Sequence, residues 1–120
     1  MKQRKTFISA KERQQLIDTL FAQSCSCVVR NGSTVCIFRE RGIKDLFCLL
    51  KEDPALLDGA FIADKVVGKG AAALMLLGGV RELFADVVSQ AALELLNATN
   101  IRLEYRLAVS SIVRRRASVL

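Results

Sequence analysis

A polar and glycine-rich segment between two apolar runs contains the residues best suited to binding chemistry. Asp64 and Lys65 follow a short apolar run at residues 60–63. Gly68, Lys69 and Gly70 then lead into a longer apolar run. Glycines at the start of a helix leave backbone N–H groups exposed, and these groups favour an anion. Lys65 and Lys69 are four residues apart, so they would share a face if both were helical. Asp64 could pair with either lysine or orient a hydroxyl group of a ligand.

The same segment differs from a nucleotide-binding P-loop. That motif requires G-x-x-x-x-G-K-[ST], and here position 63 is Ala instead of the first Gly and position 70 is Gly instead of the hydroxyl residue. A Walker motif is therefore rejected, while the weaker expectation of an anion at the helix start remains. A salt-bridged helix cap with closely packed glycines is the structural alternative, and it stays open.

Two further residues are candidates for the same kind of site. Ser89 could offer its hydroxyl group to a ligand, because it lies at the end of an apolar strand-like run and at the start of a helical run. Most serines at the start of a helix, however, only cap that helix. Arg41, before Gly42, could hold a carboxylate or a phosphate, although an arginine in a turn is usually solvated. The candidate ligand-binding residues are Asp64, Lys65, Gly68, Lys69, Ser89 and Arg41.

The sequence has no histidine. This excludes Ser-His-Asp and Cys-His nucleophiles and every His-ligated metal site within the chain. Cys25, Cys27, Cys36 and Cys48 lack the usual C-x2-4-C spacing of zinc sites, so we expect packing residues rather than a thiol cluster. We predict no metal and no cofactor.

The positive charge of the chain is concentrated at its ends. The formal net charge is +6, but eight of the 18 basic residues lie within residues 2–13 and 114–116 with only Glu12 among them. Ten basic and eleven acidic residues remain in 14–113. A nucleic-acid-binding fold usually carries its basic face through the folded body, so we do not expect nucleic acid as a partner. No apolar run approaches the length of a membrane span and no secretory signal is visible, which predicts a cytoplasmic location.

Periodicity predicts helices alternating with strands after an opening helix and hairpin. Helices are expected at 10–22, 43–51 and 90–97, with a further apolar helix that ends at Gly78-Gly79 and belongs in the middle of the core. Strands are expected at 25–30, 33–38, 60–63, 83–88 and 101–107, the first two joined by a turn at Asn31-Gly32. That turn would place Cys27 opposite Cys36, with Cys25 and Cys27 on one face.

This order predicts an α/β fold with three α/β/α layers and a mixed sheet of about five strands. The whole chain, 1–120, reads as one domain, with basic tails at 1–9 and 114–120. Ligands in such sheets bind beyond the carboxyl ends of the strands, where Asp64 and Ser89 are expected.

Several segments together resemble the uncharacterised bacterial and archaeal family called domain of unknown function 1893. They are Arg41-Gly42-Ile43-Lys44, Lys51-Glu52-Asp53-Pro54, residues 63–69, Gly78-Gly79-Val80, and Val88-Ser89 followed by Ala92-Leu93. The resemblance implies a cytidine-deaminase-like fold. It does not imply deamination, because the H-x-E and P-C-x-x-C zinc motifs would fall at about residues 63–65 and 89–93, where this chain has no such ligands.

Three functions follow as hypotheses. The first is a non-zinc domain that binds a small anionic or nucleotide-like molecule at the corner from Asp64 to Lys69. The second is a structural module, a homo-oligomer formed through an edge strand such as 101–107 or through the tails. The third is a metal-independent enzyme with Lys65 or Lys69 as base and Asp64 or Ser89 assisting.

Overall fold

The computed structural model describes residues 7–39 and 43–111. Its elements, in chain order, are α1 (Ala10–Ala22), β1 (Cys27–Asn31), β2 (Thr34–Phe38), α2 (Lys44–Glu52), α3 (Pro54–Leu57), β3 (Phe61–Val67), α4 (Lys69–Gly78), β4 (Glu82–Ser89), α5 (Gln90–Asn97) and β5 (Arg102–Val109). The order agrees with the predicted one, with α3 as an additional single turn that Pro54 begins. Within the described ranges, no helix is long and apolar enough to cross a membrane.

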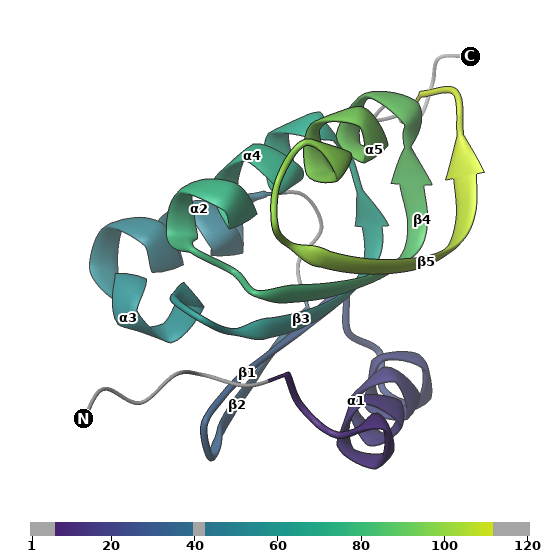
Figure 1. Cartoon of the computed structure of the whole chain (residues 1–120). Helices are drawn as coiled ribbons and strands as arrows, with labels where there is room; N and C mark the ends of the chain where they lie inside the picture. Colours follow the sequence, from purple (N-terminus) through teal and green to yellow (C-terminus); the bar gives the residue numbers. More distant parts are fainter. Residues whose placement is uncertain (1–6, 40–42, 112–120) are drawn as a thin grey trace.

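The five strands form one mixed sheet in the order β2-β1-β3-β4-β5. β1 is antiparallel to both β2 and β3, whereas β3, β4 and β5 run parallel to one another. The parallel neighbours are joined by α4 and α5, because parallel strands need a crossover connection. α1 lies on one side of the sheet and the other helices lie on the opposite side (Figure 1). The predicted α/β class with a mixed five-stranded sheet is confirmed.

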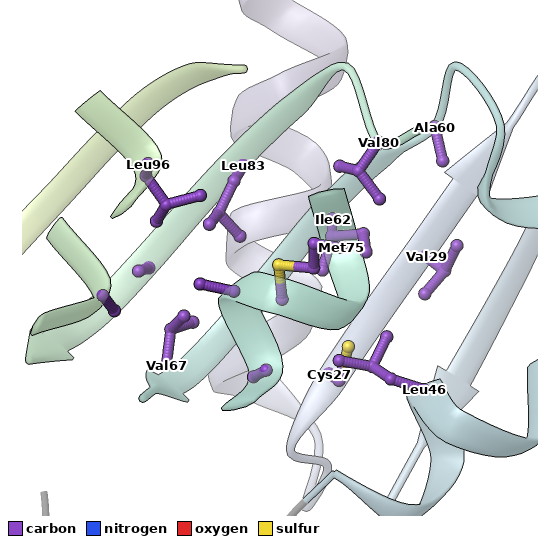
Figure 2. Close-up of a cluster of buried hydrophobic side chains, with 14 of the residues drawn as sticks. Cys27, Val29, Leu46, Ala60, Ile62, Val67, Met75, Val80, Leu83 and Leu96 are labelled. Atoms are coloured by element: carbon purple, nitrogen blue, oxygen red, sulfur yellow. The ribbon is translucent and has the colours of Figure 1, made fainter. Parts of the chain in front are cut away.

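Each face of the sheet has its own apolar cluster. The larger cluster lies under α2 to α5 and includes Cys27, Ile62, Met75 and Leu83, which point toward one another between helix and sheet (Figure 2). The smaller cluster joins α1 to the other face, with Leu20 completely buried at its centre. The two clusters make the sheet the middle layer of the molecule.

α4 packs against the sheet along one face but is not buried on all sides. Ala71, Ala72 and Met75 are buried, whereas Leu77 is 72% exposed. The prediction of a helix in the middle of the core was therefore wrong, because α4 belongs to an outer layer and only one of its faces meets the sheet. Its predicted end is confirmed, since Gly79 adopts a left-handed conformation (φ 83°) and its N–H donates to the carbonyl of Leu76.

The β1–β2 hairpin has a different register from the predicted one. Asn31 pairs with Thr34, and Gly32 is the first residue of the turn, with φ 62°. A glycine with positive φ followed by a residue with negative φ is the combination used by type II′ turns, which places glycine first. Cys36 therefore lies opposite Val29 and not opposite Cys27.

Cys25 and Cys27 also fall on different faces, contrary to prediction. Cys25 belongs to the cluster under α1 and Cys27 to the cluster under α2 to α5. The N–H of Ser26 donates to the carbonyl of Phe38, which is also the residue paired with Cys27. Two residues opposite one form a bulge, and a bulge shifts the alternation of side chains by one.

Candidate functional site at the carboxyl end of β3

β3 extends through the polar residues that the sequence suggested as a corner. It runs from Phe61 to Val67, so Asp64 and Lys65 lie within the strand. Asp64 pairs with Cys27 of β1 on one side and with Ala85 of β4 on the other. The N–H of Lys65 donates to the carbonyl of Ser26 at 3.1 Å. Because β1 and β4 pair with this part of β3 on both sides, the segment stays extended although its local sequence favours a turn.

Asp64 is a buried carboxyl group on the face that carries the larger cluster. Its residue is only 8% exposed, and its register partner Cys27 belongs to that cluster. The N–H of Val66 donates to Oδ1 of Asp64 over a long 3.4 Å. A carboxyl group buried with so little hydrogen bonding is costly in its charged form.

Burial raises the pKa of Asp64 from 3.8 to about 7, and hydrogen bonds from the backbone of Val66 and Lys65 oppose the rise. The thiol of Cys27 also has its pKa raised, first by burial and then by the charges of Asp64 and Asp45. The carboxyl group of Asp64 therefore titrates near neutral pH, and the thiol of Cys27 beside it stays protonated.

The start of α4 follows this strand directly. Gly68 is the residue before the helix, it makes no side-chain cap, and its carbonyl accepts from the N–H of Ala72 at 3.0 Å. A Cβ added at Gly68 would meet nothing within 4 Å, and one at Gly70 would only touch Ile43 at 3.8 Å. The first N–H groups of a helix have no acceptor within it. Among the described residues no side chain caps this helix start, and Lys69 and Gly70 are exposed, so an anion could approach the first N–H groups together with the side chain of Lys69.

Lys65 does not join Lys69. Lys65 belongs to a strand and Lys69 to a helix, so the two cannot share a helical face. Neighbouring Ala63 packs in the cluster under α1. Because side chains alternate along a strand, Lys65 points to that same face, away from Asp64 and α4. Of the two predicted lysines, only Lys69 lies at the start of α4.

Ser89 ends β4 and caps α5. It is 4% exposed, and its Oγ accepts from the N–H of Ala92 at 3.0 Å. Val88 and Val67 are register partners, so β3 and β4 end side by side. Ser89 is thus at the expected edge of the sheet, with its hydroxyl engaged in the helix cap. Arg41 lies outside the described residues.

The four cysteines do not converge. Cys25 and Cys27 are buried on opposite faces, Cys36 is half-buried on β2, and Cys48 is exposed on α2. Within residues 7–39 and 43–111, no three His, Cys, Asp or Glu side chains are placed to hold a metal ion.

Two surface hollows formed by described residues lie at the other end of the parallel strands. The larger, of about 700 Å³, is lined by Gly59, Arg81 and Ile101, each of which precedes a strand. The smaller, of about 350 Å³, lies between Pro54 and Leu77. Phe7 lies near the same end, with the guanidinium carbons of Arg81 and Arg102 each 4.4 Å from its ring centre. These hollows are separate from the candidate site around Asp64.

Two members of the site could not be read from the sequence. The sequence predicts only a packing role for Cys27, and its position beside Asp64 follows from the pairing of β1 with β3. Asp45, in the first turn of α2, influences the thiol of Cys27 although it lies far away in the chain. The contact between Ile43 and the Gly70 position places the start of α2 beside the start of α4.

These features define a three-layer α/β domain with a buried carboxyl group near the start of a glycine-flanked helix. The sequence matches the family described as "TM1506: Domain of unknown function (DUF1893)" over residues 15–118, and the chain belongs to that family. No curated protein matches the sequence at a significant level.

A solved structure shares the architecture. It is the crystal structure of a DUF1893 family protein, TM1506, from Thermotoga maritima. The two are similar with a TM-score of 0.83 and 21% sequence identity, over 96% of this chain and 78% of the other. At this identity the likeness concerns the fold alone.

Proposed function

We propose that this protein binds a small anionic or nucleotide-like molecule at the carboxyl end of β3. The observation that carries the proposal is the start of α4, where Lys69 and Gly70 are exposed and no described side chain caps the helix, and which follows directly on a strand holding a buried carboxyl group. The first N–H groups of α4 and Lys69 would receive a phosphate or carboxylate. In sheets of this kind, ligands bind beyond the carboxyl ends of parallel strands.

Asp64 would form a hydrogen bond with the uncharged part of the ligand. Because its pKa is raised to about 7, its carboxyl group can be protonated at neutral pH and donate a hydrogen bond to a ring nitrogen or a carbonyl. A neutral carboxyl group also avoids repelling the anion held at the helix start. The thiol of Cys27 lies beside it on the same face.

A cytidine-deaminase-like fold is part of this proposal, and zinc-dependent deamination is not. The positions that correspond to the zinc motifs are occupied by Ala63, Asp64 and Lys65 on β3 and by the segment from Ser89, the last residue of β4, to Leu93 in α5. The chain contains no histidine. A cytoplasmic location is also proposed, because four unpaired thiols suit a reducing compartment.

The enzymatic alternative has less support from the geometry. A lysine base would act with Asp64 or Ser89, yet Lys65 points to the face opposite Asp64, Lys69 begins the next helix, and the hydroxyl of Ser89 already accepts from the N–H of Ala92. The interaction alternative rests on a different part of the molecule, the strand edges.

The binding proposal is tested with a panel of nucleoside monophosphates, cyclic nucleotides and sugar phosphates, measured by calorimetry and by thermal shift. We expect at least one compound to bind in the micromolar range. Lys69→Ala should weaken that binding at least tenfold, because it removes the only lysine at the start of α4. Lys65→Ala is the matched control, since it removes the same charge from the other face. Absence of binding across the panel, or equal losses in both variants, would refute the proposal.

A further inference from the structure

Among residues 7–39 and 43–111, β2 is an edge strand with no further strand on its outer side. It is the outermost strand of the sheet on its side, next to β1. The N–H of Lys65 donates to the carbonyl of Ser26, which therefore points toward β3. Backbone groups alternate in direction along a strand, so those of Val28 and Arg30 also point toward β3, and those of the residues between them point toward β2. The hydrogen-bonded backbone pairs between β1 and β2 are therefore Asn31 with Thr34, Val29 with Cys36, and Cys27 with Phe38. The N–H and C=O groups of Val35 and Ile37 point away from the sheet.

The two edges of the sheet differ in how they are protected. β5, the opposite edge, carries Arg102, Glu104 and Arg106, and pairing with β4 skips Arg106. Charges and irregular pairing are the usual means by which an edge strand avoids another chain. β2 has the sequence Thr-Val-Cys-Ile-Phe, with no charge, proline or glycine, and Val35 is 49% exposed. Of the two edges, β2 is the one open to pairing.

We propose that the β2 edge of this protein pairs with β2 of a second copy, antiparallel and about a two-fold axis at Cys36. This register aligns all five residues of β2 with the five of the second copy. Val35 faces Ile37 of the second copy on the side of α1, and each such pair exchanges two backbone hydrogen bonds. On the other side, Thr34 faces Phe38 of the second copy. The pairing creates no like-charge contact and continues the sheet across both molecules.

Self-complementarity is the reason for choosing a second copy as the occupant. An uncharged edge has no group that would select a charged peptide. Antiparallel pairing with a second β2, in contrast, places β-branched Val35 opposite β-branched Ile37. A two-fold interface also uses the same patch on both subunits. Shifting the register by two residues in either direction reduces the overlap and brings the turn at Gly32 or the side chain of Arg39 into the interface.

The register has a chemical signature at Cys36. Its backbone groups face β1, so Cys36 and Cys36 of the second copy form a non-hydrogen-bonded pair. Such pairs have Cα atoms about 4.5 Å apart, which lies within the range that a disulfide can span. Cys48 is the exposed cysteine and must be removed from the experiment, whereas Cys25 and Cys27 are buried.

The first test is native mass spectrometry of the full chain. We expect a species of twice the 13.2 kDa chain mass. Val35→Pro removes an N–H that points to the free edge, where proline is tolerated, and should raise the dimer dissociation constant at least tenfold. Tyr105→Pro makes the same change at the free edge of β5 and should leave the dimer intact. Val35→Lys, which places a charge on the β2 edge, is the second disrupting variant in case the proline variant does not fold.

The second test is oxidation with diamide. Two Cys36 thiols would lose two protons and two electrons to diamide, and the disulfide would join the copies. A Cys48→Ser variant should form a covalent dimer that dithiothreitol reverses, and a Cys36→Ser/Cys48→Ser variant should not. A monomeric wild-type chain, dimers that persist in both Val35 variants, or cross-linking without Cys36 would overturn the proposal.

Discussion

Asp64→Asn should remove the pH dependence that a buried carboxyl group imposes on stability. The pKa of Asp64 is about 7 in the folded chain and 3.8 in the unfolded chain. A raised pKa in the folded state means that the folded chain binds more protons than the unfolded chain between these values. Stability therefore falls as the pH rises from 3.8 to about 7, and the full penalty is present above that range.

The magnitude follows from the two pKa values. A difference of about 3.2 units corresponds to roughly 4 kcal/mol at pH 8, at 1.36 kcal/mol per unit. Of this, about 2.6 kcal/mol develops between pH 5 and pH 8. An asparagine has the same shape and does not titrate. The free energy of unfolding of the variant, relative to the wild type, should thus rise by about 2–3 kcal/mol over that interval, whatever the amide itself costs.

The assay is urea denaturation of both proteins at pH 5, 6.5 and 8, at one protein concentration. Glu94→Gln serves as the control, because Glu94 is exposed on α5 and its neutralisation should leave the two curves parallel. Cys27 does not interfere, since burial raises the pKa of its thiol above its ordinary value of 9.0. A difference between wild type and Asp64→Asn that stays constant from pH 5 to pH 8 would refute a buried, titrating carboxyl group at this position.

Two further predictions concern the elements around the site. Gly78→Ala should lower the free energy of unfolding by about 1–3 kcal/mol, because the added Cβ would lie 2.8 Å from Cδ1 of the fully buried Leu57. Gly68→Ala, where the added Cβ meets nothing within 4 Å, is its control in the same thermal melts, and equal losses would contradict the packing argument. Ser89→Ala should cost about 0.5–2 kcal/mol through the lost bond from the N–H of Ala92 and leave ligand affinity unchanged, so a fall in affinity would assign Ser89 to the site instead.

Helix limits were predicted well because the signals are local. α1 and α5 begin at the residues predicted for them, and the hydroxyls of Ser9 and Ser89 just before them each accept a hydrogen bond from the backbone N–H three residues later. The end of α4 was likewise fixed by Gly79, whose positive φ suits glycine. Each of these features depends on a few consecutive residues, so the amino-acid sequence by itself determined them.

The edge of the sheet and its register needed the tertiary structure. Asn31-Gly32 is a strong turn signal, yet the turn lies one residue further on, and the side chain of Asn31 donates to the carbonyls of Leu56 and Asp58 instead. A segment 25 residues away thus takes part in fixing the hairpin. Local patterns cannot contain such a contact.

The candidate site shows the same division. The sequence identified Asp64, Lys69 and the glycines as the residues most suited to binding, and it supplied the fold class that brings strand ends together. It could not tell that Asp64 belongs to a strand, that Lys65 faces away from it, or that Cys27 lies beside it. Those relations come from pairing β3 with β1 and β4, which are distant in the chain. The raised pKa of Asp64 has the same origin, because burial is a property of the assembled layers and not of any segment alone.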